Sequence, residues 1–168
     1  MNLLFDFTVD KANATIHITR EFAADLDLVW DAFTKAEILD QWFAPKPLRL
    51  QTKEMDFREG GRWLYAMIND EKVIGWSLVN FLKIEAKSSF SSRNSFSDEN
   101  GNPMNTGFTS SQTITSFKAG RDTTTVEITK KMTNLEELEK FIAMGYKDGM
   151  NAVMSNLDEY FSTLVETK

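Results

Sequence analysis

The sequence predicts an α+β domain in which one curved antiparallel sheet, accompanied by two short helices, wraps around one long C-terminal helix. Three observations predict this fold class. Alternating apolar and polar residues, which are typical of strands, dominate residues 5–22 and 48–132. Two short segments with helical spacing separate these stretches, and a long amphipathic segment begins near residue 133. A sheet and one long helix with a broad apolar stripe bury most surface when the sheet curls around the helix.

The strands begin with a hairpin. Residues 5–9 and 16–22 alternate on either side of the turn-forming residues 10–13. We expect the other strands at residues 48–52, 63–68, 73–84, 88–96, 109–117 and 123–132. Gly60 and Gly61 precede strand 63–68 and form a turn that can take positive φ. Both faces of that strand are apolar, so we expect it to be covered on both sides.

The two short helices follow the hairpin. Asp25 is a candidate N-cap for the first helix, whose apolar residues continue at helical spacing to Phe33. Residues 34–37 read Thr-Lys-Ala-Glu, which matches a capping box, because the Thr hydroxyl and the Glu carboxylate can each bond a free backbone amide. This motif predicts a second helix, which must end before Pro45.

The long helix begins at a second capping box, Thr-Asn-Leu-Glu at residues 133–136. Its apolar stripe has spacings of three and four and consists of Leu138, Ile142, Gly145, Gly149, Val153, Leu157, Phe161 and Leu164. No repeat and no linker interrupts the chain. We therefore expect residues 1–168 to form a single domain, with an N-terminal hairpin strand at 3–9 and a core at 14–165.

Composition excludes several classes of function. Cysteine is absent, so we expect no disulfide, thiolate nucleophile or Cys-ligated metal, and one histidine, His17, cannot build a multi-histidine site. The net charge of -6 and the pI of about 4.9 oppose binding to nucleic acid or anionic membranes. No apolar run reaches the ~18 residues of a membrane span, and residues 1–6 lack a signal-peptide pattern. We expect a cytoplasmic protein with no membrane insertion, no metal and no cofactor.

Two features of the long helix and the strands suggest a cavity. Gly145 and Gly149 lie on the stripe that faces the sheet, where each costs about 1 kcal/mol of helix stability relative to Ala. Their missing side chains make room either for a closely packed strand or for an empty volume. Large, adaptable side chains are candidates for the lining, as is typical of apolar pockets: Trp42, Trp63, Tyr65, Met67, Trp76, Tyr146, Met150 and Met154.

Several short motifs resemble one family. They are Ile16-x-Ile18-x-Arg20-x-Phe22, Val29-Trp30-x-Ala32-Phe33-Thr34, Leu39-x-x-Trp42-Phe43-x-Pro45, Met55-Asp56-x-Arg58-x-Gly60-Gly61-x-Trp63 and Gly145-Tyr146. In order and spacing, over about residues 14–165, the chain resembles the START-like (SRPBCC) helix-grip proteins, in the branch of homologues of the activator of the heat-shock protein 90 ATPase. It departs from the pattern at Ala24, where Pro is usual, and at Phe43 and Tyr146, where Trp is usual.

The resemblance implies a deep cavity between the sheet and the terminal helix, which relatives use for lipids, sterols, polyketides or plant hormones. It also implies few fixed catalytic residues, because function in such folds depends on the pocket lining. The chaperone-activating role is a weaker expectation, since the eukaryotic activator contacts the chaperone through an additional domain that we do not expect within these 168 residues.

Four polar residues are candidates for chemistry, and each has a structural alternative. His17 lies on the strand face opposite Ile16 and Ile18, so we expect it to point to solvent. Asp56 and Arg58 are expected to stabilise the glycine turn rather than to act on a substrate. Arg93 could anchor an anionic ligand if it faced inward, but its parity relative to Phe90 and Phe96 favours the outer face.

These observations leave three hypotheses. The favoured one is a small-molecule binding protein that holds an apolar or amphipathic ligand and has no fixed catalytic machinery. An enzyme of the polyketide aromatase or cyclase type is an alternative, and it requires an ionisable residue that faces the cavity. The third is a stress-related co-regulator that binds a chaperone ATPase through its surface. In each case we expect a monomer or a weak homodimer formed through a sheet edge.

Overall fold

The computed structural model describes residues 3–104 and 106–166, so the expected domain limits at residues 1 and 168 lie outside the described residues. Its strands are β1 (Phe5–Asp10), β2 (Thr15–Phe22), β3 (Arg49–Met55), β4 (Arg62–Asn69), β5 (Lys72–Glu85), β6 (Ser89–Ser97), β7 (Ser111–Ala119) and β8 (Thr124–Lys131). Its helices are α1 (Leu26–Thr34), α2 (Ala36–Trp42), α3 (Leu135–Ala143) and α4 (Tyr146–Glu166). Each strand that the sequence predicts is present.

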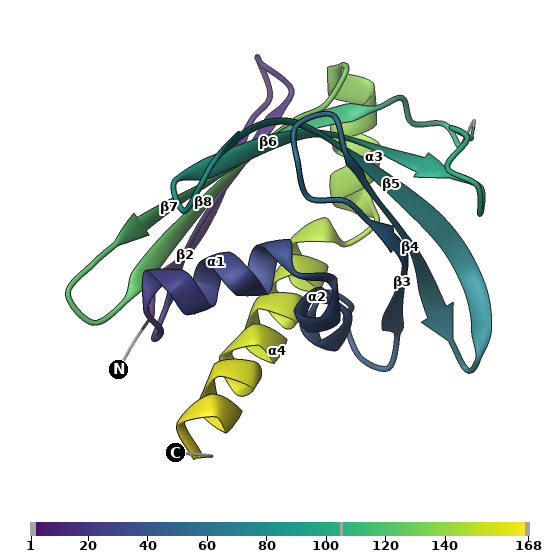
Figure 1. The fold of residues 1–168 in the computed structure, drawn as a ribbon. Helices are drawn as coiled ribbons and strands as arrows, with labels where there is room; N and C mark the ends of the chain where they lie inside the picture. Colours follow the sequence, from purple (N-terminus) through teal and green to yellow (C-terminus); the bar gives the residue numbers. More distant parts are fainter. Residues whose placement is uncertain (1–2, 105, 167–168) are drawn as a thin grey trace.

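The strands form one eight-stranded antiparallel sheet in the order β1-β2-β8-β7-β6-β5-β4-β3. β1 and β2 pair as the expected hairpin, with Phe7 opposite Ile18. The chain then passes through α1 and α2 to the far edge strand, β3, and returns strand by strand until β8 pairs with β2. Figure 1 shows that the sheet is curved, with α1, α2 and α4 on its concave side. The predicted α+β fold class is confirmed.

The boundary between the two short helices differs from the prediction. Asp25 caps α1 as expected, because its carboxylate accepts a hydrogen bond from the amide of Leu28 at 2.9 Å. The prediction of a capping box at residues 34–37 is wrong. Thr34 is the last residue of α1, and its hydroxyl donates to the carbonyl of Trp30 at 2.8 Å. The break falls at Lys35, whose extended backbone precedes α2 without a side-chain cap.

The single long terminal helix of the prediction is two helices. α3 ends at Ala143, and Gly145 takes a φ of 92°, in the left-handed region that favours glycine. The amide of Gly145 bonds the carbonyl of Ile142 at 3.0 Å, which closes α3 before α4 begins at Tyr146. Gly145 therefore ends a helix instead of interrupting an apolar stripe.

The start of α3 is displaced by one residue from the predicted capping box. Asn134 is the N-cap, and its side-chain oxygen accepts from the amide of Glu137 at 2.9 Å. Thr133 has another role, because its hydroxyl donates to the carbonyl of Ser110 at 3.2 Å. The hydroxyl thereby ties the start of α3 to the segment that precedes β7.

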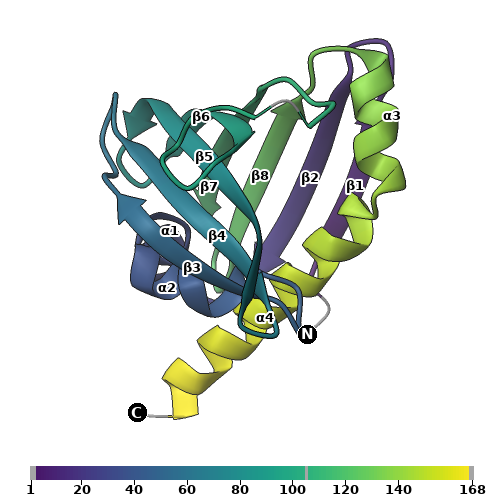
Figure 2. The same cartoon turned by 90° about the vertical axis from the view of Figure 1, so that its right-hand side faces the viewer.

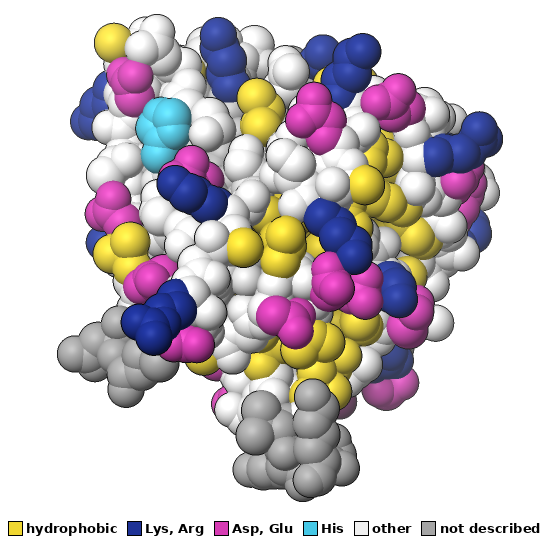
Figure 3. All heavy atoms as spheres, turned by 60° about the vertical axis from the view of Figure 1, so that its left-hand side comes forward, with side chains coloured by type: hydrophobic (Ala, Val, Ile, Leu, Met, Phe, Trp, Pro, Cys, Tyr) yellow, Lys and Arg dark blue, Asp and Glu magenta, His cyan; other side chains and the backbone are white. Residues whose placement is uncertain are grey.

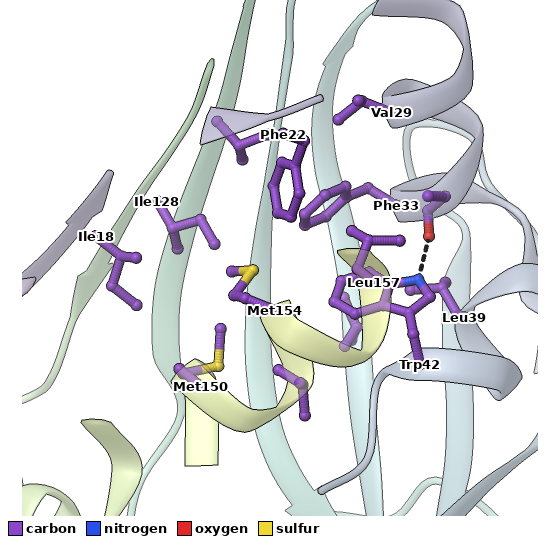
Figure 4. Packing of buried hydrophobic residues seen from close by; sticks show 14 of the residues in the cluster. Ile18, Phe22, Val29, Phe33, Leu39, Trp42, Ile128, Met150, Met154 and Leu157 are labelled. Carbon is purple, nitrogen blue, oxygen red and sulfur yellow. Dashed lines mark hydrogen bonds between the residues drawn. The ribbon is translucent and has the colours of Figure 1, made fainter. Parts of the chain in front are cut away.

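The core lies between α4, α1 and the strands near β2. The buried apolar side chains of α4 are Met150, Val153, Met154, Leu157 and Phe161. Figure 4 shows Met154 beside Ile18 of β2 and Ile128 of β8. At the end of β2, the ring of Phe22 meets Phe161 edge-on, with centroids 5.9 Å apart. The buried residues of α4 thus extend from Met150 to Phe161, along most of the helix.

The outer face of β4 is covered as well, as its sequence predicts. Leu64 and Ala66 are buried on that face. The β6–β7 connection crosses the outer side of β4 and β5 (Figure 2), where the backbone carbonyls of residues 99 and 100 accept hydrogen bonds from Lys53 at 2.6 Å and Arg62 at 3.5 Å. β4 is therefore a strand buried on both sides.

Arg20 joins α4 to the sheet through a buried charge. It shares the inward parity of Ile16, Ile18 and Phe22 on β2, and it is 6% exposed. Its guanidinium pairs with Asp158 of α4 and lies 4.8 Å from the centroid of the Phe22 ring. Burying a guanidinium removes it from water, and the attraction of the carboxylate offsets most of that cost in free energy. The ion pair therefore holds the C-terminal half of α4 in place.

We predict that Asp158→Asn lowers the free energy of unfolding by about 2 kcal/mol, because it leaves the buried Arg20 unpaired while Asp158 itself is partly exposed. Glu159→Gln is the matched control, since the neighbouring Glu159 pairs with Lys46 at 2.9 Å with both side chains more than two-thirds exposed. Its effect should stay below about 1 kcal/mol. Urea unfolding measures the free energy of both variants. Equal losses in Asp158→Asn and Glu159→Gln would contradict the anchoring role of Arg20.

Candidate functional site

A cavity of about 360 Å³ lies between the concave face of the sheet and helices α3 and α4. This volume is within the range of roughly 300–1,000 Å³ that is typical of small-molecule sites. Apolar side chains form most of its wall, among them Phe81, Phe90, Phe96, Ile128, Phe141 and Val153. Its polar groups are mainly hydroxyls and amides on neighbouring strands, together with one lysine.

Five of the eight predicted lining residues border this cavity. Trp63, Tyr65 and Met67 face it because they share one side of β4, and Tyr146 and Met150 face it from α4. The rings of Trp63 and Tyr65 are adjacent, with centroids 4.2 Å apart. The alternation of side chains along a strand therefore places the β4 residues as the sequence predicts. Their contact with a ligand stays a prediction.

Trp42 and Met154 do not border the cavity, and the prediction for them is corrected. Trp42 is 1% exposed, and its indole N–H donates to the carbonyl of Ala32 at 2.9 Å (Figure 4). Its ring also meets Phe33 edge-on at 4.9 Å. Met154 lies one helical turn beyond Met150 and is fully buried in the core. Both side chains stabilise the packing of the helices on one another and on the sheet.

Trp76 lies on the outer face of the sheet, so its prediction is also corrected. The register places Trp76 opposite Ala66, whereas Ser77 is opposite Tyr65. Because directly opposed residues project from the same face, Trp76 points away from the cavity that Tyr65 borders. Its ring packs there beside the ammonium of Lys53, at 5.7 Å.

The two glycines that the sequence assigns to cavity shaping have different roles. Gly149 borders the cavity, and a Cβ placed there would meet no atom within 4 Å. The missing side chain therefore leaves open space beside α4. Gly145 does not border the cavity, since its positive φ serves to end α3. Only Gly149 enlarges the cavity in the manner that we expected.

Two tyrosine hydroxyls supply polar groups at the wall. Burial raises the pKa of Tyr65, and a hydrogen bond with Ser77 opposes part of this effect. Burial, reinforced by the neighbouring Tyr65, raises the pKa of Tyr146 as well. Both groups therefore stay neutral at physiological pH, so they can donate or accept hydrogen bonds but carry no charge.

Lys130 is the functional candidate that the sequence analysis missed. It borders the cavity from β8 and is 9% exposed. Its ammonium donates to the hydroxyl of Ser111 at 2.9 Å and lies 5.3 Å from the ring centroid of Phe141. Burial lowers its pKa to about 8. An ionisable residue thus faces the cavity, so the condition that we set for the enzyme alternative is met.

A signal for Lys130 exists in the sequence. Val126, Ile128, Lys130 and Met132 occupy alternate positions, and the first two are apolar residues of a predicted strand. Strand parity alone therefore places Lys130 on the inner face. In the structure all four are buried, and Ile128, Lys130 and Met132 border the cavity.

The other polar candidates lie away from the cavity. His17 is exposed on β2, where its Nδ1 lies 3.4 Å from the hydroxyl of Thr129; it is visible among mixed charges in Figure 3. Arg58 pairs with Asp56 at 2.7 Å within the glycine turn, as expected. Arg93 is exposed on the outer face, which agrees with its predicted parity.

Two further features concern residues 3–104 and 106–166, the part of the chain that the structure describes. No three His, Asp or Glu side chains of these residues gather closely enough to hold a metal ion. No helix in this part of the chain combines the length and the apolarity that crossing a membrane would require.

We predict a pH signature for Lys130. Its pKa is about 8 in the folded protein and near the ordinary 10.5 in the unfolded chain, so the unfolded chain binds more protons between these values. The unfolding free energy should therefore rise by about 2 kcal/mol from pH 7 to pH 10 relative to Lys130→Met. The comparison ends at pH 10. Above that pH the buried tyrosines, whose pKa values burial raises, lower the unfolding free energy as the pH increases.

The control for this measurement is Lys131→Met, which alters the next residue of β8, an exposed lysine. Chemical denaturation at each pH gives the three profiles. The wild type and Lys131→Met should run parallel, and Lys130→Met should diverge from both. Three parallel profiles would contradict the burial of an ionisable Lys130.

Solved structures show the same architecture. A crystal structure of protein Ms6760 from Mycobacterium smegmatis has a TM-score of 0.86 and 22% identity, and the alignment covers 97% of this chain and 99% of that one. A solution structure from Arthrobacter aurescens has a TM-score of 0.86 and 23% identity over 94% of this chain and 91% of that one. One from Staphylococcus epidermidis has a TM-score of 0.79 and 25% identity over 90% and 92%.

No curated protein matches the chain. The sequence model of one family, described as Activator of Hsp90 ATPase homolog 1-like protein, matches residues 23–162. That range includes the helix pair, the glycine turn and most of α4, and it contains four of the five motifs quoted above; the motif at residues 16–22 precedes it. The chain therefore belongs to the family of Activator of Hsp90 ATPase homolog 1-like proteins, with the START-like helix-grip fold.

Proposed function

We propose that this protein binds a small apolar or amphipathic molecule in the cavity between the sheet and helix α4. The observation that carries the proposal is the space of about 360 Å³ beside Gly149, bounded by carbon-rich side chains from β4 and α4. Well-packed protein interiors leave few voids larger than a water molecule, so a space of this size beside a helix favours an occupant.

The wall suits a ligand with a long apolar part and few polar atoms. Each methylene of the ligand that moves from water into contact with such a wall contributes about 0.8 kcal/mol to the free energy of binding. The hydroxyls of Tyr65, Tyr146 and Ser77 offer hydrogen bonds that would orient a polar group. Family membership supports the same proposal, because helix-grip proteins are known for holding hydrophobic ligands between the sheet and the C-terminal helix.

Two alternatives have less support. An aromatase or cyclase would use Lys130, which faces the cavity, but no carboxylate or imidazole of the described residues borders the cavity with it. General acid–base work would then depend on this lysine and on tyrosines whose pKa values burial has raised. The family description names an activator of the Hsp90 ATPase, and a surface contact of this chain with a chaperone stays a separate hypothesis.

A homologous series of 1-alkanols tests the proposal. We predict that affinity rises about fourfold for each added methylene from 1-octanol to 1-dodecanol, since each one adds about 0.8 kcal/mol of burial. Tryptophan fluorescence reports the binding, because Trp63 borders the cavity.

Gly149→Leu places a side chain in the open space and should weaken 1-dodecanol binding about tenfold, the equivalent of roughly two displaced methylenes. Ser155→Leu, on an exposed position of the same helix, is the matched control and should bind as the wild type does. If the wild type binds no alkanol, or if Gly149→Leu binds as tightly as Ser155→Leu, the proposal is wrong.

A further inference from the structure

Lys130 is a charge without a counter-ion. It is the one charged side chain of the described residues that borders the cavity. None of the ion pairs in this part of the chain includes it. The hydroxyl of Ser111 accepts one hydrogen bond from its ammonium, and the face of Phe141 lies against the charge. An ammonium has three donors, so its capacity exceeds what Ser111 takes up.

The buried carboxylate of α3 does not supply the missing charge. Glu137 is 6% exposed, and it accepts hydrogen bonds from both the amide and the hydroxyl of Thr109, the latter at 3.0 Å. Burial alone accounts for the lowered pKa of Lys130, with no contribution from a neighbouring acid. Glu137 thus fastens the segment that precedes β7 to α3, and Lys130 is in no ion pair of the described residues.

The lysine belongs to a row of polar side chains that crosses the inner face of the sheet. The register places Thr113 of β7 opposite Lys130, and Ser92 of β6 opposite Thr113. All three border the cavity. The hydroxyl of Thr113 is buried and has no hydrogen-bond partner among the described residues. A buried hydroxyl without a hydrogen-bond partner, next to a buried ammonium, is unusual in a protein interior. The pair indicates that a bonding partner is missing.

We infer that the ligand is a carboxylate-bearing amphiphile, whose acid group binds Lys130 while its apolar part fills the space beside Gly149. This inference rests on the proposed function and adds the chemical class of the ligand. One ammonium balances one negative charge, so a carboxylate matches the site, whereas a dianionic head group would leave a charge uncompensated in an apolar environment. A protein with a net charge of -6 does not attract anions through its overall field, so selectivity must come from this lysine.

The energetic cost of a lysine at this position supports the same inference. Packing between Ile128 and Met132 would be satisfied by an unbranched apolar side chain such as Met. A buried lysine instead lowers stability until an anion compensates it. The position therefore serves recognition of an anion.

Dodecanoic acid and 1-dodecanol form the test pair, because they share a chain length and differ in the charged head group. At pH 7 we expect the wild type to bind the acid about tenfold or more tightly than the alcohol, as a charge-assisted hydrogen bond would provide. Lys130→Met should abolish this preference, so that the variant binds the acid and the alcohol with affinities within about twofold of each other. Lys131→Met, which alters an exposed lysine on the same strand, should keep the preference.

Titration calorimetry gives the affinities, and denaturation curves establish that each variant is folded. If the wild type binds the alcohol as tightly as the acid, or if the preference survives in Lys130→Met, the carboxylate assignment is overturned and the proposed function still stands. If neither compound binds the wild type, both are overturned.

Discussion

The structure depends on one geometric constraint, which is that a single helix does not fill the concave face of an eight-stranded sheet. Helix α4 is fixed at its C-terminal half, where Asp158 pairs with the buried Arg20 and Phe161 packs on Phe22. Its N-terminal half, from Tyr146 to Val153, instead borders the cavity. The ion pair and the Phe161–Phe22 contact thus fix the helix, and the open space lies beside its first turns.

The division between packing and recognition also appears within single strands. On β8, Val126 and Ile128 continue the apolar core, and two residues later Lys130 brings a cation into the same face. On β7 and β6 the opposing residues are Thr113 and Ser92 instead of aliphatic side chains. The hydroxyl of Ser92 bonds the side chain of Asn94, whereas the buried hydroxyl of Thr113 has no partner among the described residues, which is unfavourable in a closed core. It becomes favourable when a polar ligand group bonds this hydroxyl.

Much of this architecture can be predicted from the sequence, and the parts that cannot have definite causes. Strand alternation correctly assigns the inward faces of Trp63 and Tyr65, because parity along one strand needs no knowledge of its neighbours. The side on which Trp76 lies depends on the β4–β5 register, which contains a shift between Met67 and Ile68 that composition does not reveal. The helix break at Gly145 is not visible in the apolar spacing, which continues across it. Strand parity also places Lys130 on the inner face, but a lining predicted from large apolar side chains does not include a lysine.

The proposed function requires open, largely apolar space between Gly149 and the inner face of β4. A crystal of the protein under xenon pressure tests this most directly, because xenon enters apolar cavities and scatters strongly. We expect xenon density bounded by Gly149, Trp63 and Met67. Side chains packed together across this space, with no xenon between them, would contradict it.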